Sequence, residues 1–127
     1  AFGRRLVPGM TDRPVRTIYV AGDYRGAAVV IDTPLAPYLS KFAVTTVARG
    51  EGVGRDLWHA LSADLPRLYW RSSAGNPITS WYREQCDGLQ RLGTGPSDWV
   101  VLWRGLQAHE LAPAIAYCAE APADFVG

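Results

Sequence analysis

The stretch Ala48–Trp58, ARGEGVGRDLW, organises the fold of this sequence, because three glycines at alternate positions join an apolar run to a helical pattern. A strand, a glycine-rich turn and a helix in this order bring several free backbone N–H groups to the positive end of a helix dipole. Such a point can hold an anion. Tight backbone geometry is an alternative reason for the glycines, so the neighbouring sequence has to distinguish the two.

The segments on either side of the glycines have clear patterns. Tyr38–Val47, YLSKFAVTTV, is β-branched and aromatic and predicts a long strand with Lys41 on the face opposite Phe42. After the glycines, a leucine at every fourth position from Leu57 to Leu65, followed by a proline, predicts an amphipathic helix. We expect the apolar stripe of this helix to cover the sheet.

Shorter elements are predicted farther out along the chain. Arg16–Val20 and Ala27–Asp32 predict two antiparallel strands joined by a turn that contains Gly and Asp. Leu68–Ser72 predicts another strand. Asn76 and Pro77 then occupy the cap and the first position of a short predicted helix.

The C-terminal part of the sequence alternates between polar and apolar segments. Asp87–Asp98 is polar and predicts a loop, whereas Trp99–Leu106 is apolar on both faces and predicts a buried strand. The Ala-rich tail to about Ala121 predicts a helix, with Pro113 at its start or at a kink. We find no internal repeat and no domain boundary, so residues 1–127 are predicted to form one domain.

Composition argues against several classes of partner. The thirteen basic and twelve acidic residues are intermixed, so the sequence has no polybasic surface for nucleic acid or anionic lipid. No apolar run approaches the roughly twenty residues that span a bilayer. We therefore expect neither a nucleic-acid nor a membrane partner. Cys86 and Cys118 lack the spacing of metal ligands, so we expect two buried, reduced thiols and no metal site.

Two familiar phosphate-binding loops do not match the glycine stretch. The dinucleotide fingerprint requires a third glycine where Leu57 stands, and the triphosphate-binding loop requires a Gly-Lys-Ser/Thr end that is absent. What remains is a basic residue followed by two glycines at fixed offsets, Arg49-x-x-Gly52-x-Gly54, directly after a strand. This pattern resembles the acyl-coenzyme A signature of the Gcn5-related N-acetyltransferases.

The resemblance implies acetyl-coenzyme A as the acetyl donor. In that family the amides of the turn bind the pyrophosphate, and the preceding strand hydrogen-bonds the pantetheine arm like an added strand. A backbone N–H near Ala43 or Val44 would polarise the thioester carbonyl. The implied cofactor-binding residues are Ala43, Val44, Arg49, Gly50, Glu51, Gly52, Val53 and Gly54.

Three further stretches make the resemblance more specific. YLSKFAV, YWRSSAGNPITSWY and DWVVLWRGL, in this order, resemble the acetyltransferase domain of vertebrate-like N-acetylglutamate synthases, which include bacterial bifunctional synthase/kinases. The resemblance implies an α/β fold of the Gcn5-related type, with a mixed, mostly antiparallel sheet flanked by helices. It implies that the first strand and helix of that fold lie upstream of Ala1. It also implies that an amino-acid-kinase domain precedes residues 1–127 and that the parent chain forms a homo-oligomer.

The activity implied is transfer of the acetyl group from acetyl-coenzyme A to the α-amine of L-glutamate, which gives N-acetylglutamate for arginine biosynthesis without a metal. The expected compartment is the cytoplasm in a bacterium and the mitochondrial matrix in a eukaryote. Two alternatives stay open. In the first, the chain is a regulatory or assembly module of an N-acetylglutamate kinase. In the second, it is an acetyltransferase for another small amine.

Glutamate carries two carboxylates, so its site requires fixed cations. Lys41 and Arg71 lie within otherwise apolar strands, where an unpaired charge is costly, although edge-strand side chains that reach solvent explain the pattern equally well. By resemblance, Lys41, Arg71 and Asn76 bind glutamate, and Arg4 provides a second basic contact. Ser73 departs from the family, whose members often carry an arginine at this position. The absence of that cation would weaken carboxylate binding.

The same resemblance makes Tyr82, Asn76 and Lys41 the catalytic residues. Tyr82 would hydrogen-bond or protonate the departing sulfur, and an ordinary aromatic contact between helix and core is the alternative. No carboxylate base is evident, so a water path or a side chain would deprotonate the amine, and positioning would supply much of the acceleration. His59 and His109 are predicted to lie on the surface, and no motif for a serine nucleophile is present.

Overall fold

The computed structural model describes residues 2–5, 15–21, 25–44 and 52–121. These residues form two compact units, the first ending at Pro66 and the second beginning at Arg67. Each unit has its own strands and its own helical cover, and each is described in turn.

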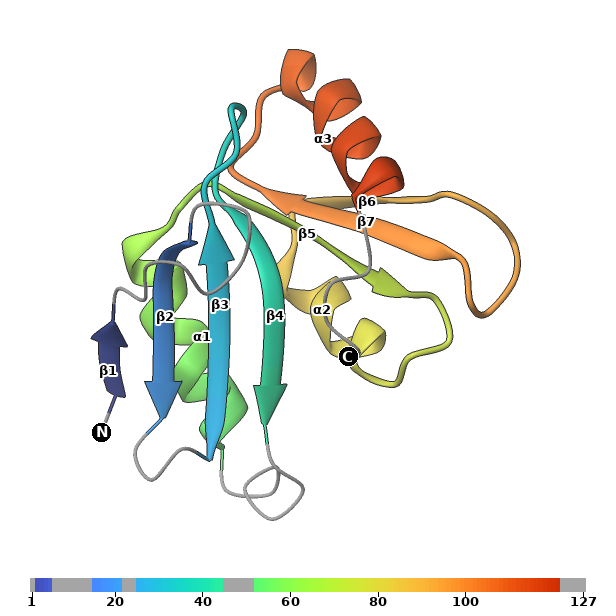
Figure 1. The fold of residues 1–127 in the computed structure, drawn as a ribbon. Helices are drawn as coiled ribbons and strands as arrows, with labels where there is room; N and C mark the ends of the chain where they lie inside the picture. The colour runs from blue at the N-terminus through green and yellow to red at the C-terminus, as the bar shows by residue number, and fades with distance from the viewer. Residues whose placement is uncertain (1, 6–14, 22–24, 45–51, 122–127) are drawn as a thin grey trace. The chain divides into compact units, whose positions relative to one another are not determined.

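Unit 1 contains four strands in the order β1–β2–β3–β4, and each neighbouring pair is antiparallel (Figure 1). Their bounds are Phe2–Arg5 for β1, Val15–Ala21 for β2, Gly26–Ile31 for β3 and Tyr38–Val44 for β4. The predicted hairpin is therefore confirmed as β2 and β3. The sequence did not predict β1, and the last part of the predicted long strand, residues 45–47, lies outside the described residues.

Strand β4 contains one extra residue, Ser40. Lys41 pairs with Val29 and Leu39 pairs with Val30, so Ser40 has no opposite residue on β3. An extra residue of this kind is a β-bulge, which bends the strand and increases its twist. Because of the bulge, Leu39 and Lys41 point to opposite faces of the sheet even though they are two positions apart.

Helix α1, Val53–Asp64, covers one face of the unit 1 sheet and contacts β2, β3 and β4, as predicted (Figure 1). Its buried stripe comprises Val53, Leu57, Trp58 and Leu61. Phe42 of β4 packs edge-on against Trp58, with ring centroids 5.6 Å apart. Lys41 therefore lies on the face of β4 that points away from α1, as predicted.

Unit 2 contains three antiparallel strands in the order β5–β7–β6. The bounds are Leu68–Ser73 for β5, Gly88–Arg91 for β6 and Trp99–Arg104 for β7. The prediction of a loop over Asp87–Asp98 is wrong for β6. Strand β6 has a single large apolar residue, Leu89, no fully buried residue and a place at an edge, so its conformation depends on pairing with β7 and not on a buried face.

Two helices lie on opposite faces of the unit 2 sheet: α2, Ile78–Gln85, and α3, Ala108–Glu120 (Figure 1). Two consecutive residues of β5 contact different helices. Tyr69 packs edge-on against Tyr117 of α3 at 5.7 Å, and Trp70 packs edge-on against Tyr82 of α2 at 5.6 Å. The alternation of a strand therefore gives β5 an α3 face and an α2 face.

Helix α3 starts with a capping box formed by Gln107 and Glu110, and Glu110 also binds Arg67 through both carboxylate oxygens. The start expected at Pro113 is therefore wrong, because the box starts the helix earlier and Pro113 lies inside it. Cys118 is buried as predicted, whereas Cys86 is only partly buried. Within the described residues, no helix is long and apolar enough to cross a membrane.

Candidate functional site

The predicted cofactor site falls on β4 and on the start of α1. Ala43 and Val44 end β4, and Gly52, Val53 and Gly54 form the first positions of α1. The remaining predicted cofactor-binding residues lie outside the described residues: Arg49, Gly50 and Glu51.

The start of α1 has the geometry of an anion site. Gly52 is the N-cap with φ of 78°, a left-handed conformation that glycine adopts without steric cost. The carbonyl of Gly52 accepts the Asp56 N–H at 3.0 Å, which begins the helical ladder. No side chain among the described residues caps the helix, and the N–H groups of a first helical turn that lack a side-chain cap are suited to bind an anion.

Arg55 adds a positive charge at the same point, and sequence reasoning missed it. Its Nη2 lies 3.3 Å from the position that a Cβ atom on Gly52 would take, so the guanidinium folds back over the N-cap. The signal was present in the sequence, because Arg55 directly follows the last glycine of the motif. A guanidinium and a helix start together favour a phosphate group.

The end of β4 carries the two residues predicted to bind the pantetheine arm, Ala43 and Val44. The side chain of Val44 packs against Ala21 and Val53, and its Cγ2 atom would lie 3.4 Å from a Cβ atom on Gly54. Ala43 is exposed and points to the other face of the strand, the face that carries Lys41.

Lys41 is half-buried, lies opposite Val29 of β3 and is next to the bulge at Ser40. Arg4 lies in β1 opposite Tyr19.

Arg71 lies on the α3 face of β5 and is held by three groups. Its Nη1 donates to the carbonyls of Cys118 at 2.6 Å and Ala121 at 2.8 Å, which are at the C-terminal end of α3. Its Cζ atom lies 4.0 Å from the centroid of the Trp99 ring. The negative end of the helix dipole and the aromatic face both stabilise the guanidinium there.

Asn76 closes the turn between β5 and α2. Its Oδ1 accepts the Ile78 N–H at 3.1 Å, its N–H donates to Ser73 O at 3.0 Å, and its carbonyl accepts the Thr79 N–H at 2.9 Å. The predicted positions are wrong by one residue, because α2 begins at Ile78 and its N-cap is Pro77, so the Asn76 side chain binds the first N–H of the helix from one position before the cap.

A buried pair of hydroxyls also fixes this turn. Thr79 Oγ1 donates to the carbonyl of Ser73 at 2.7 Å, so Ser72 Oγ must donate to Thr79 Oγ1, also at 2.7 Å. Both side chains are buried, and burial makes such bonds costly to break. The sequence did not indicate a role for Thr79.

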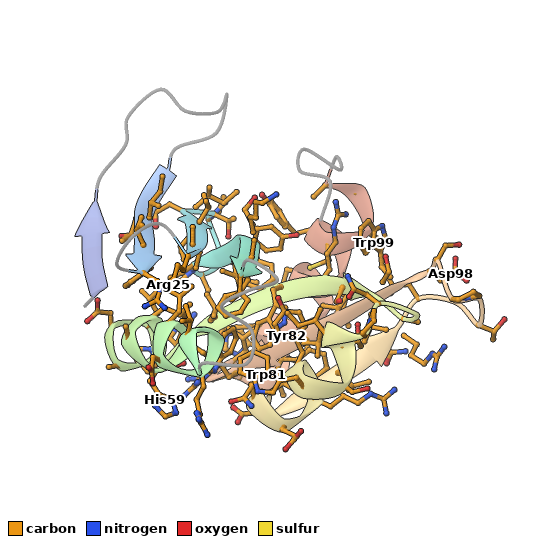
Figure 2. The ribbon with its side chains drawn as sticks, turned by 90° about the horizontal axis from the view of Figure 1, so that it is seen from below. Arg25, His59, Trp81, Tyr82, Asp98 and Trp99 are labelled. Carbon is orange, nitrogen blue, oxygen red and sulfur yellow. The ribbon has the colours of Figure 1, made fainter. Side chains whose placement is uncertain are left out.

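Tyr82 lies on the α2 face of β5, and its ring contacts the rings of Trp70 at 5.6 Å and Trp81 at 5.8 Å. Figure 2 labels Tyr82 and its neighbour Trp81. Only 5% of its surface is exposed, and this burial raises the pKa of its phenol. The phenol is therefore neutral at physiological pH and can donate a hydrogen bond but cannot act as a base. The aromatic contact between helix and core, which the sequence offered as the alternative role of Tyr82, is present.

The structure does not bring all predicted residues of unit 2 into one cluster. Arg71 faces α3 and Tyr82 faces α2, so they lie on opposite faces of β5, and Asn76 follows the end of the strand. His59 and His109 are exposed, as predicted. The described residues contain no group of three His, Cys, Asp or Glu side chains that could hold a metal ion.

Comparison with known proteins assigns this geometry to a family. The family model described as the N-acetyltransferase of N-acetylglutamate synthase matches residues 8–121. The chain belongs to this N-acetyltransferase family. This membership confirms the resemblance found in the sequence, since the matched residues include the glycine motif and every strand from β2 to β7.

Named relatives agree with the N-acetyltransferase family. The chain is 33% identical over 124 residues to a protein of Xylella fastidiosa named acetylglutamate kinase, a match that covers 96% of this chain and 28% of that protein. It is 38% identical over 113 residues to mitochondrial N-acetylglutamate synthase of Homo sapiens, covering 84% of this chain and 20% of that protein. The chain thus spans between a fifth and a third of the length of these relatives.

Solved structures confirm the fold. A Gcn5-related acetyltransferase of Desulfovibrio desulfuricans has a TM-score of 0.58 at 15% identity, covering 82% of this chain and 96% of that chain. A Gcn5-related acetyltransferase of Bacteroides thetaiotaomicron has a TM-score of 0.57 at 16% identity, covering 80% of this chain and 68% of that one. The chain has the Gcn5-related N-acetyltransferase fold, as the N-acetyltransferase family membership requires.

Proposed function

We propose that this chain transfers the acetyl group of acetyl-coenzyme A to the α-amine of L-glutamate. The observation that carries the proposal is the start of α1, where a left-handed Gly52, uncapped N–H groups and the Arg55 guanidinium meet in a chain of the N-acetyltransferase family. These groups fit the pyrophosphate of coenzyme A, which carries negative charge and many acceptor oxygens.

The donor is proposed to lie along β4 and to end at α1. The first turn of α1, with Gly52, Val53, Gly54 and Arg55, would hold the pyrophosphate. The main chain of Ala43 and Val44 would bind the pantetheine arm and polarise the thioester carbonyl. Arg49, Gly50 and Glu51 complete the proposed set by resemblance.

Glutamate is proposed to be bound by Lys41, Arg71 and Asn76, with Arg4 as a further cation. Lys41 points away from α1, and Arg71 points toward α3 in a fixed position. A guanidinium that is already ordered loses little entropy when it binds a carboxylate. Ser73 provides no charge here, so fewer cations are available than in relatives with an arginine at this position.

The proposed reaction is a direct transfer. The neutral amine nitrogen attacks the thioester carbon, the C–N bond forms, the C–S bond breaks, and the nitrogen proton passes to solvent. Coenzyme A leaves as a thiolate, and the neutral Tyr82 phenol donates a hydrogen bond to the sulfur. Because burial raises the pKa of Tyr82, hydrogen bonding is favoured over full proton transfer to the weaker base.

The intact protein is proposed to carry an amino-acid-kinase domain before this chain, as the relative named acetylglutamate kinase suggests. The N-acetylglutamate that the intact protein makes would serve arginine biosynthesis. The intact protein would form homo-oligomers. A bacterial protein would act in the cytoplasm and a eukaryotic one in the mitochondrial matrix, as the relatives named mitochondrial suggest.

Titration with acetyl-coenzyme A, followed by assay of N-acetylglutamate formation, tests the proposal. We expect binding, and turnover that depends on L-glutamate and falls in the Lys41→Ala variant. Turnover of another amine in place of glutamate would overturn the substrate assignment. Binding of acetyl-coenzyme A without any turnover in the intact protein would favour a regulatory module of the kinase. Such a module has no acetyltransferase activity that the Lys41→Ala substitution could lower.

A further inference from the structure

We propose that the segment leading into β7, Pro96–Trp99, positions both residues of unit 2 that are proposed to bind glutamate, Arg71 and Asn76. The inference rests on the proposed function and deepens it, because it assigns glutamate affinity to residues that need not touch glutamate. Figure 2 shows Asp98 and Trp99 together at the start of this strand.

Trp99 positions Arg71 directly. Arg71 is opposite Val101 on β7, and Trp99 is two positions from Val101, so both side chains lie on the α3 face. The guanidinium lies over the Trp99 ring while its Nη1 binds two carbonyls of α3. The ring thus covers one face of the guanidinium and limits the directions in which its N–H groups can point.

The same segment holds the turn that ends in Asn76. The N–H of Ala74 donates to Asp98 O at 2.9 Å, and the N–H of Gly75 donates to Pro96 O at 2.7 Å. A Cβ atom on Gly75 would lie 2.9 Å from Pro96 Cβ and 3.0 Å from Pro96 O. This close approach requires glycine, so the turn and the segment pack as one surface.

Asp98 keeps the segment in the shape that these contacts require. Its Oδ2 accepts the N–H of Gly95 at 2.9 Å, and its own N–H donates to the carbonyl of Gly95 at 3.2 Å. Asp98 therefore closes a small turn from which its carbonyl reaches Ala74. Arg71 and Asn76 thus depend on one segment, although they lie on different elements.

Trp99→Leu in the intact protein tests the first contact. We expect KM for glutamate to rise about three- to thirtyfold, as for loss of a cation–π contact, while KM for acetyl-coenzyme A stays unchanged. Trp99→Phe retains a ring and should restore most of the affinity. The matched control is Trp103→Leu, because Trp103 is on the same face of β7 but opposite Tyr69. Equal effects of both leucine variants would overturn the inference.

Gly75→Ala tests the second contact. We expect KM for glutamate to rise and the amide of Ala74 to exchange faster with solvent, with KM for acetyl-coenzyme A unchanged. The double variant Gly75→Ala, Pro96→Gly removes the nearest clashing carbon and should recover part of the loss. A rise in both KM values together would overturn the inference, because it would indicate general damage to the fold.

The proposed function can fail without deciding this inference. If the unaltered protein does not acetylate glutamate, the proposed function is wrong, and NMR of the Arg71 Nε–H group decides the positioning role. Slower solvent exchange of this group in the unaltered protein than in Trp99→Leu supports the role. Equal exchange in the two proteins overturns it.

Discussion

Tyr82 is the residue at which burial decides the chemistry. Its phenol is enclosed by Trp70 and Trp81 and has a raised pKa, so it stays protonated throughout the pH range of the reaction. A thiolate leaving group ordinarily has a pKa near 8.5, well below that of this phenol. Tyr82 is therefore suited to stabilise the sulfur by a hydrogen bond that needs no change in its own ionisation.

Tyr82→Phe is expected to lower kcat by about ten- to a hundredfold, the range for loss of one hydrogen bond to a charged group. The shape of the pH–rate profile between pH 6 and 9 should not change, because the raised pKa keeps Tyr82 neutral across this range. Steady-state kinetics of the intact protein measure both. Tyr117→Phe, on the other helix and against Tyr69, is the control and should keep full activity.

The backbone conformation at the start of α1 can be tested for its role in binding acetyl-coenzyme A. Gly52→Val places a β-branched residue at φ of 78°, which costs about 1–3 kcal/mol and shifts the backbone N–H groups of the first turn. We expect the Kd for acetyl-coenzyme A to rise more than tenfold in isothermal titration. Gly52→Asn is the control, because asparagine tolerates the left-handed region, and it should bind nearly normally. Normal binding by Gly52→Val would contradict the assignment.

Helix α3 permits a second test. Glu110 forms the capping box with Gln107 and a bidentate pair with Arg67, and the hydrogen bond from Arg67 lowers the pKa of the carboxyl below its usual value. A lowered pKa means that the stabilisation is present above the unfolded pKa and is lost as the pH falls through the folded one.

Glu110→Gln is therefore expected to lower the Tm at pH 7, since it weakens the pair with Arg67. The difference in Tm from the unaltered protein should narrow as the pH falls below about 4. Thermal melts followed by circular dichroism over this range measure it. A difference that stays constant with pH would show that the charge of Glu110 does not contribute.

The sequence predicted elements whose pattern is local. The β2–β3 hairpin and the leucine spacing of α1 are examples, since each pattern reports a face that is buried by the element itself. Strands β1 and β6 were missed because each has four residues with a single large apolar side chain, and their conformation depends on a neighbouring strand. The bulge at Ser40 was missed because it is a property of the pairing of β4 with β3.

For the candidate site too, the sequence predicted some residues and missed the contacts that fix them. Residue types such as Lys41, Arg71 and Asn76 were identified from motifs in the sequence. The groups that fix them were not, because the carbonyls that bind Arg71 are 47 and 50 positions away in the chain. Thr79 and Trp99 likewise act through contacts that only the folded chain creates.

For the molecule as a whole, two buried acidic groups, the Cys118 thiol and the Tyr82 phenol, contribute to the change of stability at high pH. Burial raises the pKa of the Cys118 thiol to about 12 and raises the pKa of the Tyr82 phenol as well. Both groups ionise first in the unfolded chain, near pH 8.5 and 10, so the unfolded state is stabilised as the pH rises. The stabilisation from the two neutral, buried groups is complete below these unfolded-state pKa values and decreases as the pH rises above them.

We therefore expect the free energy of unfolding, measured by urea titration, to fall from about pH 9 upward. In a Cys118→Ala, Tyr82→Phe double variant the protein should be less stable at pH 7 but should lose less stability between pH 9 and 11. Parallel pH dependences of the double variant and the unaltered protein would contradict the assignment of this effect to the two groups.

The extra residue in β4 also has a consequence for how such a gene can change. Removing the Ser40 codon would leave Leu39 and Lys41 adjacent and still opposite Val30 and Val29, so every pair of the ladder would be kept. The shortened strand would be more regular and would lose only its bend. We therefore expect a deletion of Ser40 to preserve the folded state and to change only the curvature of β4 beside Lys41.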